Sequence, residues 1–190
     1  MSPSRRISLG RVKNGLSARA APAKRIALAR LTRAAKRKPA RRAKLQATFD
    51  VILADLLAEI DASRTTLRLD DVALGFSVAD VAGEARLATE KSLRGQTSIN
   101  QRAAPTAQWI EQYRRLLVQN DFSVRALRPP EALLRLYGVK AQMLAPVIRN
   151  GRLDGWVSVH ETRRVRKWSR TDQAAVVAAT KRILQALEGD

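Results

Sequence analysis

The fold is decided by the stretch Gln142-Met-Leu-Ala-Pro146-Val-Ile-Arg-Asn-Gly-Arg-Leu-Asp-Gly155-Trp-Val-Ser-Val-His160, which predicts two antiparallel strands joined by a tight turn. Asn150-Gly151 readily adopts the positive φ angles of a type I′ turn, and apolar residues flank it on both sides. We therefore expect a β-hairpin with strands over 139–149 and 152–161.

Alternation along the hairpin divides its side chains between two faces of a sheet. One face is expected to be apolar and to pack under long helices; along the second strand it carries Leu153, Gly155, Val157 and Val159. The opposite face is mixed and would carry Arg68, Gln142, Trp156, Ser158 and His160, with Asp154 beside them. Such a face suits a pocket with a few polar groups that orient a ligand.

Regular elements are expected on both sides of the hairpin. Apolar residues at spacings of three and four predict a helix from Leu45 to Ile60. Strands are expected over 65–69, 76–79 and 116–119, a short helix over 107–114, a two-turn helix over 131–137, and a final helix that Ser169 caps. The predicted fold class is α+β: a central antiparallel sheet with long N- and C-terminal helices on one face and short helices and loops on the other.

The positive charge is concentrated ahead of this domain. The net charge is +19, yet the first 49 residues hold fifteen Lys and Arg and no acid, which leaves about +4 for the rest. We expect 1–44 to be a basic, disordered arm and 45–188 to be one domain. Within the arm, Ala23 to Lys38 favours a transient helix that Pro39 interrupts.

The arm has a candidate function of its own, the sequence-independent binding of nucleic-acid phosphates. The residues expected to do this are Arg33, Lys36, Arg37, Lys38, Arg41, Arg42 and Lys44. The arm lacks aromatic residues, which argues against base stacking. A solvated extension without a dedicated partner and contact with an anionic membrane surface are the alternatives.

Composition excludes several classes of function. The chain has no cysteine, which removes disulfides, thiol nucleophiles and thiolate metal sites, and its single histidine makes a metal site an unattractive hypothesis. No segment is apolar enough to span a bilayer and no export signal is evident, so we expect a cytoplasmic protein. No cofactor or metal is expected.

The hairpin, together with Trp168-Ser-Arg-Thr-Asp172 and the apolar helix that follows it, resembles the C-terminal half of a GAF domain. The resemblance extends back to Leu45, and a PAS-like domain is the alternative. It implies a module that senses a small organic ligand or regulates, and that commonly dimerises through its terminal helices; we expect no catalytic activity. Bilin-binding relatives and those that reduce methionine sulfoxide need cysteines, which this chain lacks, and the Asn-Lys-x-x-Phe-x-x-x-Asp-Glu pattern of cyclic-nucleotide-binding relatives does not appear.

The candidate ligand site combines the mixed sheet face with an aromatic lid and one strand-end acid. Its residues are Arg68, Trp109, Tyr113, Asp121, Gln142, Trp156, Ser158 and His160, with Tyr137 as a further lid residue. Alternatively, these side chains bond to the irregular middle segment and line no cavity. Two functions follow: a ligand-sensing GAF protein, or a nucleic-acid-associated protein whose arm binds phosphate while the domain dimerises.

Overall fold

The computed structural model describes residues 20–124, 127–129 and 131–189, with side chains from Lys38 onward except those of Ala132 and Leu133. The chain divides into two units, Met1–Arg37 and Lys38–Asp190, and all that follows concerns the second unit apart from the first part of one helix. The helices are α1 (Ala20–Ile60), α2 (Pro105–Tyr113), α3 (Glu131–Tyr137) and α4 (Arg170–Glu188), with a 3₁₀ turn, η1, at Gln101–Ala103. The strands are β1 (Arg64–Leu69), β2 (Gly83–Arg86), β3 (Leu117–Gln119), β4 (Ala141–Arg149) and β5 (Arg152–Glu161).

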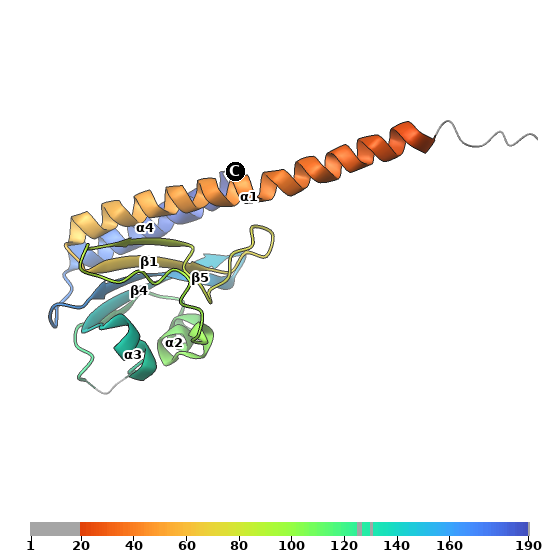
Figure 1. Ribbon diagram of the computed structural model, residues 1–190. Coiled ribbons are helices and arrows are strands. Elements are labelled where there is room, and N and C mark those ends of the chain that lie inside the picture. Colours follow the sequence, from red (N-terminus) through yellow and green to blue (C-terminus); the bar gives the residue numbers. More distant parts are fainter. Residues whose placement is uncertain (1–19, 125–126, 130, 190) are drawn as a thin grey trace, which may run out of the picture. The chain divides into compact units, whose positions relative to one another are not determined.

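The five strands form one antiparallel sheet in the order β2-β1-β5-β4-β3 (Figure 1). The domain part of α1 and the whole of α4 lie on one face, and α2 and α3 lie on the other. The expected α+β class and its layers are confirmed. The hairpin turn is confirmed as well, because Asn150 and Gly151 have φ angles of 49° and 72°.

The main core lies between the two long helices and the apolar sheet face. It is built from the helical stripe predicted in α1, the stripe of α4 and alternate residues of the central strands; among its members are Leu45, Phe49, Leu53, Leu56, Met143, Ala145, Val157, Val159, Val176 and Ile183. At the sheet edge, a Cβ on Gly83 would lie 2.7 Å from that of Phe49, so β2 can approach α1 this closely only with glycine. The helix α4 begins as expected, with a capping box between Ser169 and Asp172.

The strand expected over 76–79 is absent from the described residues, and the sheet edge is formed by Gly83–Arg86 instead. Side chains take up the backbone groups of the 76–79 segment. The Arg68 guanidinium donates to the carbonyl oxygens of Val78 and Ala79, at 2.8 and 2.9 Å, and Asp70 accepts from the Val78 N–H at 2.8 Å. Backbone N–H and C=O groups that already have side-chain partners do not require hydrogen bonds to a neighbouring strand.

Helix α1 begins at Ala20 and includes Pro39, whereas the sequence predicted that the domain helix begins at Leu45 and that Pro39 breaks the helix before it. A proline removes one N–H donor and crowds the carbonyl group four residues earlier, which weakens a helix locally; here the helix continues through Pro39. Past Pro39 the helix already belongs to the domain, because the Arg42 guanidinium lies 5.1 Å from the centre of the Phe76 ring.

The prediction that Leu153 lies on the apolar sheet face under the long helices is also wrong. It packs with Leu144 and Trp156 on the face opposite Val157, because the register shifts between Val147 and Ile148. Val147 pairs with Gly155 and Ile148 with Leu153, which leaves Asp154 as the extra residue of a β-bulge. Strict alternation therefore fails from Asp154 toward the turn and holds from Gly155 to Glu161.

We predict that Gly155→Ala destabilises the domain by about 3 kcal/mol, because the new Cβ would overlap the Arg68 carbonyl oxygen of the paired strand. Urea denaturation measures the effect. Gly95→Ala is the control: its φ is 77° but nothing lies within 4 Å of the new Cβ, so it reports backbone strain alone, about 1 kcal/mol. Equal losses in the two variants would contradict the close approach of β1 and β5.

Candidate functional site

Strand register gathers the polar side chains of the mixed face. Thr66 of β1 pairs with Ser158 of β5, and Arg68 pairs with Trp156. On the other side of β5, His160 pairs with Gln142 of β4. All of these side chains are buried, so this face is covered.

A cavity of about 40 Å³ lies over this face. A water molecule needs roughly 10–15 Å³ on this measure, so the cavity has room for about three. Its polar lining comes from Thr66, Arg68, Gln101, Thr106, Tyr137, Gln142, Ser158 and His160. Its apolar lining includes Leu93, Ala104, Ala107, Phe122, Leu134, Val139, Leu144 and Trp156. The cavity thus has a polar sheet side and largely apolar walls.

The phenol of Tyr137, at the end of α3, lines the cavity beside Arg68. Its oxygen accepts hydrogen bonds from Arg68 Nη2 at 2.8 Å and from Gln101 Nε2 at 2.9 Å. Its ring centre lies 5.6 Å from that of His160. These contacts join η1, α3, β1 and β5 around one hydroxyl group.

His160 is a neutral, buried imidazole. Burial, together with the positive charges of Arg64 and Arg68, lowers the pKa of His160 from 6.5 to about 3. Its Nδ1 has no hydrogen-bond partner among the described residues. A buried polar atom without a partner costs free energy, and a ligand that supplied the partner would recover it.

Five of the eight predicted ligand residues line the cavity: Arg68, Gln142, Trp156, Ser158 and His160. Tyr137 lines it as well. The other three predicted residues, Trp109, Tyr113 and Asp121, are not among the lining residues.

The reason is the orientation of the elements that carry these three residues. Helix α2 buries Ala107 and Ile110; Trp109 is half-buried against the apolar residues around them, and Tyr113 is 48 % exposed. The two rings lie 4.9 Å apart. The Asp121 carboxylate accepts from the Ser123 N–H at 2.7 Å, so it stabilises its own turn.

Sequence reasoning did not select three polar lining residues, Thr66, Gln101 and Thr106. Thr66 could have been found, because alternation places it on the same face as Arg68. Gln101 and Thr106 lie in the irregular middle of the chain, which carries no periodic signal.

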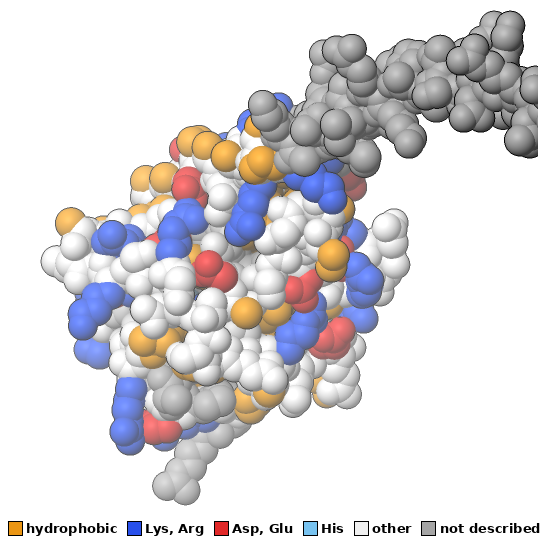
Figure 2. Space-filling view, turned by 45° about the vertical axis from the view of Figure 1, so that its right-hand side comes forward, with side chains coloured by type: hydrophobic (Ala, Val, Ile, Leu, Met, Phe, Trp, Pro, Cys, Tyr) orange, Lys and Arg blue, Asp and Glu red, His pale blue; other side chains and the backbone are white. Residues whose placement is uncertain are grey.

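The basic residues proposed for the arm fall partly outside the described side chains: those of Arg33, Lys36 and Arg37 are not described. Lys38, Arg41 and Lys44 are exposed on α1, and Arg42 is half-buried against Phe76. On the face of the domain seen in Figure 2, basic and acidic side chains are interspersed.

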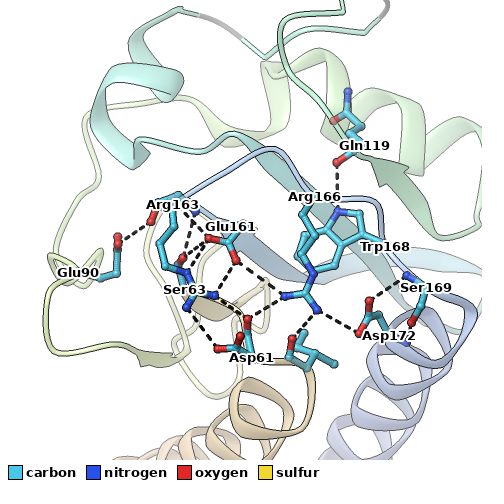
Figure 3. Close-up of polar contacts among 12 residues, drawn as sticks. Asp61, Ser63, Glu90, Gln119, Glu161, Arg163, Arg166, Trp168, Ser169 and Asp172 are labelled. Atoms are coloured by element: carbon cyan, nitrogen blue, oxygen red, sulfur yellow. Dashed lines mark hydrogen bonds and ion pairs between the residues drawn. The ribbon is translucent and has the colours of Figure 1, made fainter.

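Directly after His160, the buried side chain of Glu161 lies in a polar cluster that we call the Glu161 clasp (Figure 3). The clasp consists of Asp61, Ser63, Glu161, Arg163, Arg166 and Asp172. The Glu161 carboxylate accepts from Ser63 Oγ at 2.9 Å and from Arg163 Nε and Nη2 at 2.9 and 2.8 Å. Burial would raise the pKa of Glu161, but the hydrogen bonds from Arg163 and Ser63 outweigh it and lower the pKa from 4.5 to about 2.

Arg166 extends the clasp to both long helices (Figure 3). Its guanidinium donates to the carbonyl oxygens of Ile60 and Asp61, at 2.6 and 2.8 Å, and so caps the C-terminal end of α1. The same group binds the Asp172 carboxylate in the first turn of α4, at 3.2 Å, and its Cζ lies 4.5 Å from the centre of the Trp168 ring. The end of β5 is thus bonded to the end of α1 and the start of α4.

The described residues contain no group of three His, Asp or Glu side chains that could hold a metal ion. The helices of the described part also include none that combines the length and the apolar character needed to cross a bilayer.

These features define a class of α+β domain whose sheet bears two long terminal helices on one face and encloses a cavity on the other. Residues 44–187 match the family model of the GAF domain, so the chain belongs to the GAF family. GAF domains are in general sensory, ligand-binding regulatory domains. No protein of curated function matches the chain in sequence.

Solved structures with the same fold include the PixJ GAF domain of Thermosynechococcus elongatus in its blue-light-absorbing form, with 19% identity, a TM-score of 0.60, and coverage of 78% of this chain and 91% of that one. A type II free methionine-R-sulfoxide reductase from Thermoplasma acidophilum is 8% identical, with a TM-score of 0.58 over 78% of this chain and 96% of that one. The GAF domain region of a putative membrane protein from Geobacter sulfurreducens is 19% identical, with a TM-score of 0.58 over 79% and 97%. At these identities the likeness concerns the fold alone.

We predict that acid destabilises the protein through His160. Between pH 6.5 and about 3 only the unfolded chain binds the imidazole proton, so this residue lowers the stability by about 1.4 kcal/mol for each unit of pH decrease below 6.5. Urea denaturation at pH 7.5, 6.5 and 5.5 should show this decrease in the wild type and a shallower one in His160→Gln. Identical slopes, or an NMR titration of the single histidine near pH 6.5 in the folded state, would contradict the buried neutral imidazole.

We predict that Glu161→Gln destabilises the domain by about 2–3 kcal/mol at pH 7, because the amide cannot replace the charged acceptor of Ser63 and Arg163. The difference from wild type should be constant above pH 4.5 and should diminish as the pH falls toward 2, where the wild-type carboxylate is itself protonated. Asp61→Asn is the control: this side chain is 71 % exposed and its loss should change stability by about 0.5 kcal/mol or less. Equal effects of the two variants would mean that Glu161 does not hold the clasp together.

Proposed function

We propose that this chain is a non-catalytic sensory domain that binds a small organic ligand in the cavity between the mixed sheet face and α2 and α3. In this proposal, ligand binding changes the arrangement of the terminal helices α1 and α4. The helices transmit this change to a partner or across a homodimer. The observation that carries the proposal is a cavity lined by buried polar groups, among which His160 Nδ1 has no hydrogen-bond partner in the described part of the chain.

The position of the cavity on β5 supports a route to the helices. His160 faces the cavity, and its backbone carbonyl oxygen accepts from the Ser63 N–H at 3.0 Å. The next residue, Glu161, binds the Ser63 hydroxyl in the clasp. A ligand that shifts His160 therefore acts on the segment that caps α1 and binds the first turn of α4. The size of the response is limited by the ligand's differential affinity for the two arrangements.

The surroundings of His160 support a non-catalytic role. A histidine that acts as a general base is commonly oriented by a carboxylate, and no Asp or Glu is among the described residues that line the cavity. Ser158, two positions before His160, lies within the regular strand β5. A hydrolase nucleophile instead lies on a sharp turn between a strand and a helix.

The test is a thermal-shift screen of the full chain against a panel of neutral and charged small metabolites. A ligand present at 100 times its Kd should stabilise the protein by about 2.7 kcal/mol. The shift should be lost in Ser158→Val, which keeps the strand filled, and retained in Tyr113→Ala, whose side chain is exposed outside the cavity.

Hydrogen exchange with the identified ligand then tests the route to the helices. Protection should change in 57–63 and 163–173, the two segments that the clasp joins. A panel without any hit, or hits that Ser158→Val leaves unchanged, would overturn the binding proposal. Exchange that changes only around the cavity would overturn the transmission.

A further inference from the structure

We propose that the ligand is a short-chain monocarboxylate of about two to four carbons whose carboxylate binds Arg68. This inference rests on the proposed function, since it names the chemical class that the same cavity would take. It is carried by the charge of the cavity, by its unused hydrogen-bond donors and by its size.

The first argument is the charge of Arg68. Its side chain is buried, with 2 % exposure, and among the described residues it has hydrogen bonds but no ion pair. The neighbouring Arg64, equally buried, is paired with Glu90 at 2.8 Å. The described residues that line the cavity include Arg68 as their one charged side chain. A buried charge without a counter-ion is costly, and a monoanion would compensate it without leaving an excess of negative charge.

The second argument is the set of donors that remain unused. A guanidinium carries five N–H groups, and the hydrogen bonds to Val78, Ala79 and Tyr137 leave at least two of them without a described partner. No bond from Nε is among the described ones. Arginine binds carboxylates with two parallel N–H groups, which is what a ligand carboxylate would find here.

Neutral polar groups beside Arg68 extend this anion-binding surface. Thr66 and Ser158 pair across β1 and β5 and both line the cavity, and no hydrogen bond from either hydroxyl group is found among the described residues. The imidazole of His160 lies two residues further along β5, and its Nδ1 is also without a partner. Hydroxyl groups and a neutral imidazole can each donate one hydrogen bond to a carboxylate oxygen.

The third argument is size. The cavity volume of about 40 Å³ admits roughly three water-sized groups, which excludes nucleotides and tetrapyrroles unless the roof opens. Apolar side chains outside the sheet, such as Ala107, Phe122 and Leu134, form other parts of the cavity wall. A carboxylate with a short alkyl tail matches both properties.

The single histidine of the chain allows a direct test in the full-length protein. NMR spectra of the ¹³C,¹⁵N-histidine-labelled protein are recorded during titration at pH 7.5 with sodium acetate, propionate, butyrate and octanoate. We expect a saturable shift of the His160 signals, with affinity rising about fourfold for each CH₂ from acetate to butyrate and falling at octanoate. Acetamide and propionamide, which have the same shape without the charge, should bind at least tenfold more weakly.

Variants locate the binding group. Arg68→Lys keeps the positive charge but loses the planar guanidinium with its parallel N–H donors, so we expect at least tenfold weaker binding of propionate. Arg68→Gln should abolish propionate binding. Arg135→Gln is the matched control, because this arginine is 81 % exposed on α3 and should leave binding unchanged. If Arg68→Gln does not fold, Arg68→Lys and the comparison of acids with amides still decide the question.

The outcomes separate this inference from the proposed function. The carboxylate assignment would be overturned if the amides bind as well as the acids. It would also be overturned if chloride and phosphate shift the His160 signals as strongly as propionate does. The proposed function would survive if another compound of the metabolite panel bound in the cavity. If the His160 signals shift with no carboxylate and with no compound of the metabolite panel, both the carboxylate assignment and the proposed function are overturned.

Discussion

Strand β5 imposes the constraint on which the rest of the structure depends. Neighbouring residues of a strand point to opposite faces, so His160 faces the cavity while Glu161 enters the clasp. The same alternation places Trp156 and Ser158 in the lining of the cavity and Val157 and Val159 in the core under α1 and α4. One strand therefore contributes at once to the candidate ligand site, to the main core and to the junction of the long helices.

The buried charges of this domain fall into two kinds. Glu161 is fully neutralised: arginines, a serine hydroxyl and a backbone N–H surround its carboxylate, and its pKa falls to about 2 although burial opposes this. Such a group stabilises one arrangement of the elements that it joins, because breaking it would leave a buried charge. Arg68, by contrast, has hydrogen bonds but no anion among the described residues. The first arrangement suits a structural joint and the second suits a site that receives a charged ligand.

Much of the fold followed from local patterns. Periodicity predicted the domain part of α1 and all of α4, the Asn150-Gly151 turn predicted the hairpin, and a proline before and a glycine after predicted α3. The sheet edge did not follow, because the predicted strand at 76–79 has its backbone groups bound by Arg68 and Asp70, which are close to it only in the folded chain. The β-bulge at Asp154 likewise has no signature in the residues around it, and it moved Leu153 to the other face.

The candidate site shows the same division. The sequence by itself determined which residues of the central strands share a face, since side-chain direction in a strand is a local property, and this identified Arg68, Gln142, Trp156, Ser158 and His160. Only the tertiary structure decided that Tyr137 rather than Trp109 and Tyr113 lines the cavity, that Gln101 bonds to Tyr137, and that Arg166 joins α1 to α4. These contacts link residues far apart in the chain, and their geometry depends on how the helices pack on the sheet.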